Sequence, residues 1–166
     1  MEILNYSNKN AVILIMAGGL GKRMNSDLPK VLHKIKNKPI IVHILETALH
    51  LNIHKIGIIV GNFHSIIKDT ISQYINKDII DSKIHYIMQN EPLGTGHAII
   101  CCKKFLSKMP EYINNICILS GDVPLITCNT INNLLNNTQY CKILIANLSD
   151  PHGYGRIKTQ NNKIIK

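Results

Sequence analysis

Aromatic residues are scarce in this 166-residue sequence, which has no tryptophan and only two phenylalanines. Proteins that recognise nucleic acids commonly combine a basic patch with aromatic side chains that stack on bases. The 19 lysines and arginines give a net charge of +9, but they are scattered along the chain without a dense basic run. We therefore expect no specific nucleic-acid partner, and any binding of RNA or DNA should be weak and nonspecific.

Long hydrophobic runs and metal-binding spacings are absent as well. No apolar stretch approaches the roughly 20 residues of a membrane-spanning helix, and residues 1–10 lack the basic and apolar segments of a secretory signal. The five cysteines form no CxxC pair, and the eight histidines form no HExxH motif. We expect free thiols, a cytoplasmic location and no membrane partner. The sequence leaves the oligomeric state open.

Arginine is the scarcest basic residue. Of the 19 basic residues only Arg23 and Arg156 are arginine, and both lie in glycine-rich motifs. A chain that uses lysine almost everywhere keeps arginine where the planar, five-donor guanidinium is useful. Arg23 is therefore a candidate ligand for phosphate groups.

Apolar, β-branched runs alternate with helix-like segments. Continuous hydrophobicity is typical of strands buried on both faces of a parallel sheet. The predicted strands are residues 11–17, 55–61, 83–88, 116–122 and 142–148, and the predicted helices are about 39–51, 64–76, 96–107 and 128–138. This alternation predicts an α/β fold with a doubly wound, mostly parallel sheet. We expect residues 1–10 to form a loose extension and residues 11–166 to form one nucleotide-binding domain.

Three motifs follow predicted strands and should meet at one edge of the sheet, where α/β proteins bind ligands. The loop "AGGLGKRM" follows the first strand, "QNEPLGTGHA" follows the third and "SGDVPL" closes the fourth. The loop matches neither a Walker A motif nor a dinucleotide-binding fingerprint, so a simple glycine-rich turn is an alternative. Glycines let backbone N–H groups approach a polyphosphate, and Arg23 and Lys30 would add cationic donors there.

The segment "MAGGLGKRMNSDLPKVLH" resembles the signature loop of sugar-nucleotide pyrophosphorylases. With "QNEPLGTGHA", "GDVPLI" and "DPHGYGR", the chain resembles over residues 11–166 the uridylyltransferase domain of bacterial bifunctional N-acetylglucosamine-1-phosphate uridylyltransferase/glucosamine-1-phosphate acetyltransferases. The resemblance implies a Rossmann-like nucleotidyltransferase fold that is C-terminally incomplete here. The later sugar-binding segment and the acetyltransferase β-helix of that family have no counterpart in this sequence.

The resemblance also implies a reaction and its residues. UMP would pass from UTP to N-acetylglucosamine-1-phosphate, giving UDP-N-acetylglucosamine and pyrophosphate with Mg²⁺ as cofactor. Arg23 and Lys30 would have catalytic roles on the triphosphate, and Asp122 would hold the metal. The implied substrate-binding residues are Met16, Ala17, Gly18, Gly19, Lys30, Gln89, Gly94, Thr95, Ser120, Gly121, Asp122 and Gly155.

Two positions depart from the family pattern: Lys22 replaces a small hydroxyl residue and Ser120 replaces a tyrosine. We expect the 166-residue chain to bind UTP or UDP-N-acetylglucosamine weakly and to turn over poorly. Two alternatives stay open. One is a sister nucleotidyltransferase with another nucleotide or sugar phosphate, and the other is a noncatalytic nucleotide-binding remnant.

Overall fold

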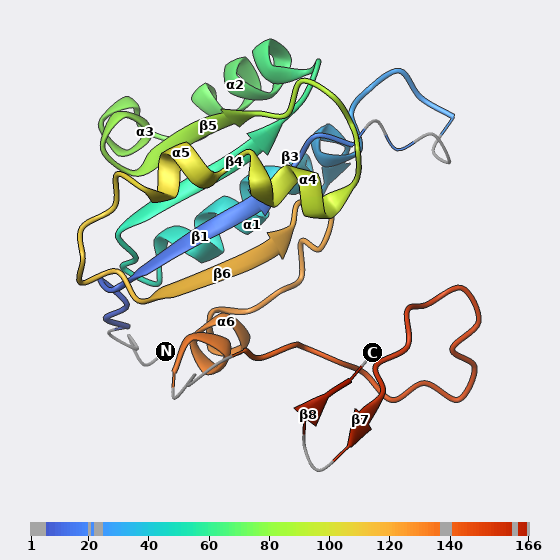
Figure 1. Ribbon diagram of the computed structural model, residues 1–166. Coiled ribbons are helices and arrows are strands. Elements are labelled where there is room, and N and C mark those ends of the chain that lie inside the picture. The colour runs from blue at the N-terminus through green and yellow to red at the C-terminus, as the bar shows by residue number, and fades with distance from the viewer. Residues whose placement is uncertain (1–5, 20, 22–24, 137–140, 161–162, 166) are drawn as a thin grey trace.

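A four-stranded parallel sheet forms the centre of the protein in the computed structural model (Figure 1), which describes residues 6–19, 21, 25–136, 141–160 and 163–165. The strand order is β5-β4-β1-β6. The strands are β1 (Ala11–Met16), β4 (Lys55–Val60), β5 (Ile84–Met88) and β6 (Asn115–Ser120). The predicted α/β fold with a mostly parallel sheet is confirmed.

Burial on both faces explains why β1 reads as an unbroken apolar run. Residues 11–15 of β1 are completely buried, and the strand pairs in parallel with β4 on one side and β6 on the other. Side chains of a strand point alternately to opposite faces. Ile13 and Ile15 therefore belong to one hydrophobic cluster, and Val12 and Leu14 belong to the other.

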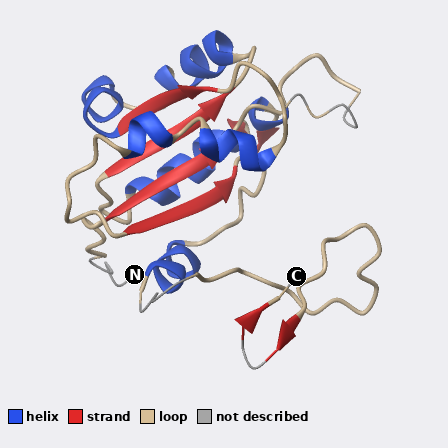
Figure 2. Ribbon diagram, viewed as in Figure 1, coloured by secondary structure: helices blue, strands red, loops and turns tan. Residues whose placement is uncertain are grey.

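Helices cover both faces of the sheet (Figures 1 and 2). One cluster packs the sheet against α1 (Ile40–Leu49), α2 (His64–Ser72) and α6 (Cys128–Leu135). The other packs it against α4 (Thr95–Ile100) and α5 (Lys103–Leu106), which lie in front of the sheet in Figure 1. The sheet is thus doubly wound, as predicted.

Shorter elements complete the described chain. A 3-10 turn, η2 (Lys30–Leu32), precedes the hairpin of β2 (Lys34–Ile35) and β3 (Lys38–Pro39). Helix α3 (Lys77–Lys83) leads into β5, and β7 (Thr159–Gln160) pairs with β8 (Lys163–Ile164).

Two local predictions were wrong, and one helix was missed. Residues 142–148 are exposed and form no strand, because no described strand lies beside them to satisfy their backbone groups. The helix predicted over 96–107 is divided into α4 and α5 at Cys101–Cys102, where the Cys102 N–H donates to Ile99 O three residues back. Helix α3 was not predicted, although Asn76 caps it by accepting a hydrogen bond from the Asp78 N–H.

The described part of the predicted N-terminal extension contacts the domain. Asn8 is buried, and its Nδ2 donates to Leu51 O and to Asn132 Oδ1, both at 3.2 Å. The Ala11 N–H donates in turn to Asn8 O at 2.9 Å, next to the start of β1. Asn8 therefore links the entry of the central strand to two distant segments of the chain.

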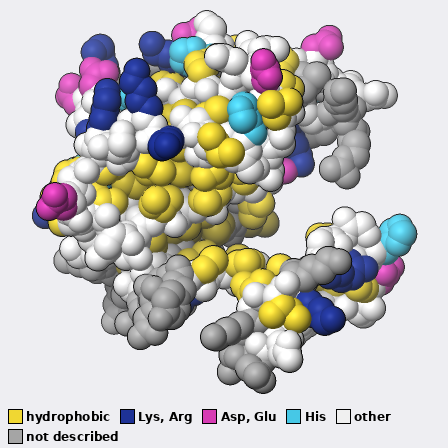
Figure 3. Space-filling model, in the orientation of Figure 1, with side chains coloured by type: hydrophobic (Ala, Val, Ile, Leu, Met, Phe, Trp, Pro, Cys, Tyr) yellow, Lys and Arg dark blue, Asp and Glu magenta, His cyan; other side chains and the backbone are white. Residues whose placement is uncertain are grey.

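Within the described residues, the outer strand β6 is covered on one face only. Cys117 and Leu119 are buried, whereas Ile116 and Ile118 are about half exposed, at 50% and 48%. Figure 3 shows hydrophobic side chains gathered over this part of the sheet. Among the described helices, none is long and apolar enough to cross a membrane.

Gly57 in β4 is a sensitive packing position. A Cβ there would lie 2.8 Å from Leu14 Cδ2 and 2.9 Å from Ile87 Cδ1, both in tightly packed strands. We predict that Gly57→Ala lowers the free energy of unfolding by about 1–3 kcal/mol, because overpacking forces neighbouring side chains to move. Urea denaturation measures the loss. Gly19→Ala is the control, since a Cβ at Gly19 meets nothing within 4 Å; equal stability of the two variants would contradict the prediction.

Candidate nucleotide-binding site

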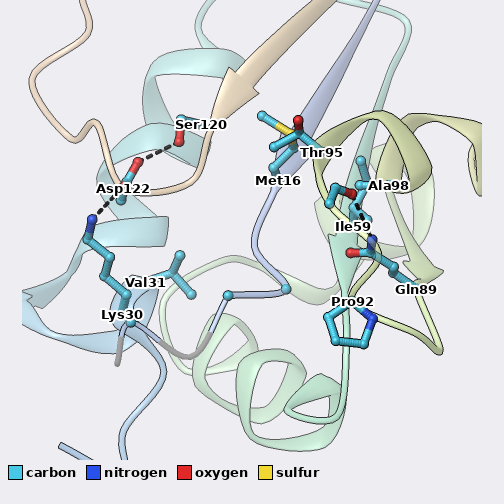
Figure 4. Close-up of a pocket in the computed structure, with 14 residues that line it drawn as sticks. Met16, Lys30, Val31, Ile59, Gln89, Pro92, Thr95, Ala98, Ser120 and Asp122 are labelled. Carbon is cyan, nitrogen blue, oxygen red and sulfur yellow. Dashed lines mark hydrogen bonds and ion pairs between the residues drawn. The ribbon is translucent and has the colours of Figure 1, made fainter. Parts of the chain in front are cut away.

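A cavity of about 300 Å³ lies at the carboxyl ends of β1, β5 and β6 (Figure 4). This volume is at the lower end of the range typical of ligand pockets. Residues from all three predicted motifs line it. The lining consists of Met16, Gly18, Gly19, Gly21, Lys30, Val31, Ile59, Gln89, Pro92, Gly94, Thr95, Ala98, Ser120 and Asp122.

Most of the predicted site residues meet at this cavity, but three of the described ones do not line it. The residues that do are Met16, Gly18, Gly19, Lys30, Gln89, Gly94, Thr95, Ser120 and Asp122. Ala17 is buried behind the loop, where its N–H donates to Ile59 O at 2.8 Å. Gly121 is also buried, Gly155 lies exposed in the C-terminal segment, and Arg23 is outside the described residues.

The parallel pairing of β1 with β6 brings the first and last motifs together. Met16 is aligned with Ser120 in the register of the two strands. The Gly121 N–H then donates to Met16 O at 2.9 Å, one residue beyond the end of β6. A Cβ at Gly121 would lie 2.5 Å from the same oxygen. Asp122 consequently leaves the sheet directly beside the glycine-rich loop.

The glycines of the loop have different physical roles. Gly18 packs against the opposite wall, since a Cβ there would lie 3.4 Å from Gln89 Oε1. Gly19 borders open space. Gly21 has φ = +71°, and a Cβ there would lie 2.8 Å from Lys30 Cβ. The loop therefore needs small residues to approach Lys30, and it leaves backbone accessible at Gly19.

Charged and hydroxyl groups form one end of the cavity. The Lys30 ammonium contacts the Asp122 carboxylate, and the Ser120 hydroxyl donates to its other oxygen (Figure 4). These hydrogen bonds, from Lys30 first and from Ser120 second, hold the pKa of Asp122 below its ordinary value of 3.8. Asp122 is therefore a carboxylate at neutral pH, close to a cation that can also bind phosphate.

The other end of the cavity presents an amide. Gln89 Nε2 donates to Gly94 O at 3.1 Å and lies 3.3 Å from His97 Nδ1. The backbone of Gln89 is fixed as well, because its N–H donates to Val60 O at 2.8 Å. An amide offers both donor and acceptor groups, which suits recognition of a base edge.

The described donor set fits a magnesium ion held jointly with a substrate. Among the described residues that line the cavity, Asp122 is the only carboxylate. No group of three or more His, Cys, Asp or Glu side chains is placed to hold a metal within the described part of the chain. Mg²⁺ commonly binds through one or two carboxylates together with substrate phosphates. Asp122 therefore suits such a shared site.

Five lining residues were absent from the predicted set. Val31, Ile59, Pro92 and Ala98 supply apolar wall, and Gly21 supplies the close approach to Lys30. The sequence contained a signal for Gly21, which is the third glycine of the loop. Ile59 and Ala98 were recognisable only as core residues of β4 and α4, because hydrophobic periodicity does not distinguish a packed side chain from one beside a cavity.

The sequence matches the Nucleotidyl transferase family over residues 12–166. The chain belongs to this family. It is 44% identical over 162 residues to a probable UDP-N-acetylglucosamine pyrophosphorylase of Acanthamoeba polyphaga mimivirus, covering 95% of this chain and 60% of the relative. It is 38% identical over 157 residues to the bifunctional protein GlmU of Clostridium botulinum strain Eklund 17B, covering 92% of this chain and 32% of the relative.

Solved structures share the fold. HddC from Yersinia pseudotuberculosis is 29% identical with a TM-score of 0.53, covering 67% of this chain and 47% of HddC. A UDP-glucose pyrophosphorylase complexed with UDP-glucose is 22% identical with a TM-score of 0.52, covering 68% of this chain and 46% of that enzyme. The chain thus spans less than two thirds of the length of these nucleotidyltransferase relatives.

The Lys30–Asp122 pair should contribute pH-dependent stability. The pKa of Asp122 is lowered in the folded state, so the contribution is present above its ordinary pKa of 3.8 and is lost as the pH falls through the lowered value. We predict a favourable coupling between Lys30→Met and Asp122→Asn in a double-mutant cycle at neutral pH, and its disappearance in acid below the lowered pKa of Asp122. Thermal unfolding of the four proteins measures it. Coupling that persists unchanged in strong acid would contradict this assignment.

Proposed function

We propose that this chain binds UTP in the cavity and takes part in transferring UMP to N-acetylglucosamine-1-phosphate. The products would be UDP-N-acetylglucosamine and pyrophosphate. One observation carries the proposal: the glycine-rich loop, the Gln89 amide and the Lys30–Asp122 pair line a single cavity. The 44% identity to a probable UDP-N-acetylglucosamine pyrophosphorylase supports the choice of substrates.

The two ends of the cavity suggest how the nucleotide lies. The base faces Gln89 and Gly94, between the apolar side chains of Pro92 and Ala98. The phosphates extend along Gly18 and Gly19 toward Lys30, where backbone N–H groups and an ammonium can bind them. This orientation places the negative charge of the triphosphate at the only end of the described lining that carries a cation.

The chemistry asked of the protein is mainly electrostatic. An oxygen of the sugar phosphate attacks the α-phosphorus of UTP, a new P–O bond forms, and the bond to the β-phosphate breaks to release pyrophosphate. The attacking oxygen is already ionised, so no general base is required. The chain's residues must hold two anions together and stabilise the charge on the phosphate oxygens.

Lys30 would bind the phosphates and Asp122 would bind a metal ion that neutralises them. Nucleotidyltransferases of this family generally use a divalent metal, and Mg²⁺ bound at Asp122 would neutralise phosphate charge. Asp122 is engaged by Lys30 in the structure. A triphosphate competes for the Lys30 ammonium, which leaves the carboxylate free for a cation. Lys30 would then bind the phosphates, and Arg23 is proposed to assist it.

Two alternatives can be tested against this proposal. HddC was also solved as a complex with GMP-PN, at 27% identity and with a TM-score of 0.52, so a guanosine nucleotide is a rival ligand. The second alternative is nucleotide binding without turnover. In that case UTP would bind, but pyrophosphate would not be released.

Nucleotide binding can be tested at Gly19. We predict that UTP binds with Mg²⁺ present and that Gly19→Ala weakens binding about tenfold or more, because a methyl group would hinder approach of the phosphates to the loop. Isothermal titration calorimetry measures the affinity. Gly96→Ala is the matched control, since it also has open space around the added Cβ but does not line the cavity. Tighter binding of GTP or CTP than of UTP would favour a sister enzyme.

Turnover is tested separately with Asp122→Asn. We predict slow pyrophosphate release by the chain with UTP, N-acetylglucosamine-1-phosphate and Mg²⁺, and loss of that release in Asp122→Asn, because a neutral amide oxygen binds Mg²⁺ more weakly than a carboxylate. A coupled pyrophosphate assay measures it. Asp81→Asn, on the exposed helix α3, is the control. No release by the wild-type chain despite UTP binding would favour the noncatalytic alternative.

A further inference from the structure

We propose that a groove along the outer edge of β5 binds an extended, acidic segment of a partner protein, which adds to the sheet as a further strand. This β5 groove has a volume of about 490 Å³, within the range of ligand-binding pockets. It shares no lining residue with the nucleotide cavity. The proposal therefore concerns a separate surface and does not depend on UTP binding.

The strand β5 lies at the edge of the sheet. It pairs in parallel with β4 on one side, and no other strand in the described part of the chain pairs with it. All five residues of β5 line the groove, although their side chains alternate between the two faces of the sheet. A groove bordered by residues of both faces runs along the strand edge, where backbone N–H and C=O groups are available. Such groups can pair with an incoming extended peptide.

The segment around helix α5 forms the wall of the β5 groove and carries two rows of side chains. The apolar row consists of Cys101, Phe105 and Met109, and the cationic row consists of Lys104 and Lys108. Members of each row are four residues apart, which places them on the same side of a helical segment. The rings of Phe105 and His85 are stacked, with centroids 5.1 Å apart and planes at 14°. This stacking packs the wall directly against the strand.

The β5 groove is positively charged. Lys55 lines it together with Lys104 and Lys108. Of the described residues in the lining only Asp81 is acidic, and its carboxylate accepts from Lys77 Nζ at 2.6 Å. None of the ion pairs between described residues includes Lys104 or Lys108. Figure 3 shows lysine and arginine side chains gathered where Figure 1 places α3 and α5. The wall thus offers cations to a ligand that brings carboxylates.

Charge decides between three possible occupants. A second copy of the chain is disfavoured, because each copy has a net charge of +9 and the exposed apolar run 142–148 contains a lysine and no acidic residue. A nucleic acid could bind the lysines but cannot pair with a strand edge. An acidic peptide uses both features, since its backbone pairs with β5 and its carboxylates contact the lysines.

Peptide binding tests the β5 groove directly. The probe is a short fluorescein-labelled peptide in which glutamate alternates with valine, and the comparison peptide has lysine in place of glutamate. We expect the glutamate peptide to bind at least about tenfold more tightly in fluorescence anisotropy, because only its charges complement those of the wall. Amide hydrogen exchange of residues 84–88 should slow when this peptide binds, since strand addition protects the edge.

A charge reversal on the wall separates docking from general attraction to a basic protein. We expect the double variant Lys104→Glu/Lys108→Glu to prefer the lysine peptide. Lys9→Glu/Lys34→Glu is the matched control, because both lysines are exposed, neither lines the β5 groove and the net charge changes equally. It should keep the preference for the glutamate peptide. Circular dichroism verifies that each variant is folded, and the two measurements on the wild-type chain need no variant.

Four results would overturn the proposal. The first is equal affinity of the wild-type chain for the two peptides, and the second is binding of the glutamate peptide without slower exchange in residues 84–88. The third is a wild-type dimer that protects the same amides without peptide, since the groove would then belong to a second copy. The fourth is a single-stranded oligothymidine that binds as tightly as the glutamate peptide and displaces it. Each of these results leaves UTP binding in the other cavity untouched.

Discussion

The pairing of β1 with β6 is the contact on which the site depends. These strands are separated by about a hundred residues of sequence, yet their register aligns Met16 with Ser120. The segments that leave the two strands must then emerge side by side. Lys30 and Asp122, which are 92 positions apart, meet for this reason. A sheet with a different strand order would contain the same motifs without assembling them.

The two ends of the cavity differ in their chemical groups. At one end, Gln89 is held by backbone groups of β4 and of the loop before α4, so its geometry is set by rigid elements. At the other end, Lys30 and Asp122 are bound to each other and partly exposed to solvent. The first end suits shape and hydrogen-bond selection of a base. The second suits exchange of ionic partners when a charged ligand arrives.

Much of the parallel sheet could be predicted from the sequence, because a strand buried on both faces reads as a continuous apolar run. The runs at residues 11–17 and 55–61 were predicted as strands since both of their faces are covered, and the motifs that follow such strands share an edge. The run at 142–148 has the same composition but forms no strand. Hydrophobicity indicates that a segment can enter a sheet, whereas the presence of a neighbour with free backbone groups decides whether it does.

The polar residues and glycines of the cavity could be predicted from the sequence, whereas its apolar residues could not. Gln89 and Asp122 stand out in a sequence, while Ile59 and Ala98 reach the cavity through the geometry of the surrounding packing. The Gly94 carbonyl illustrates a deeper limit. A main-chain oxygen is present at every position, so only the folded conformation shows which one holds a functional side chain.

Gly121 has a consequence for where the Asp122 carboxylate can lie. The Gly121 N–H donates a hydrogen bond to Met16 O, and a Cβ added at Gly121 would lie 2.5 Å from that oxygen. Any larger residue must push the end of β6 away from β1, carrying Asp122 with it. The absence of a side chain at Gly121 therefore sets the spacing between the Asp122 carboxylate and the glycine-rich loop.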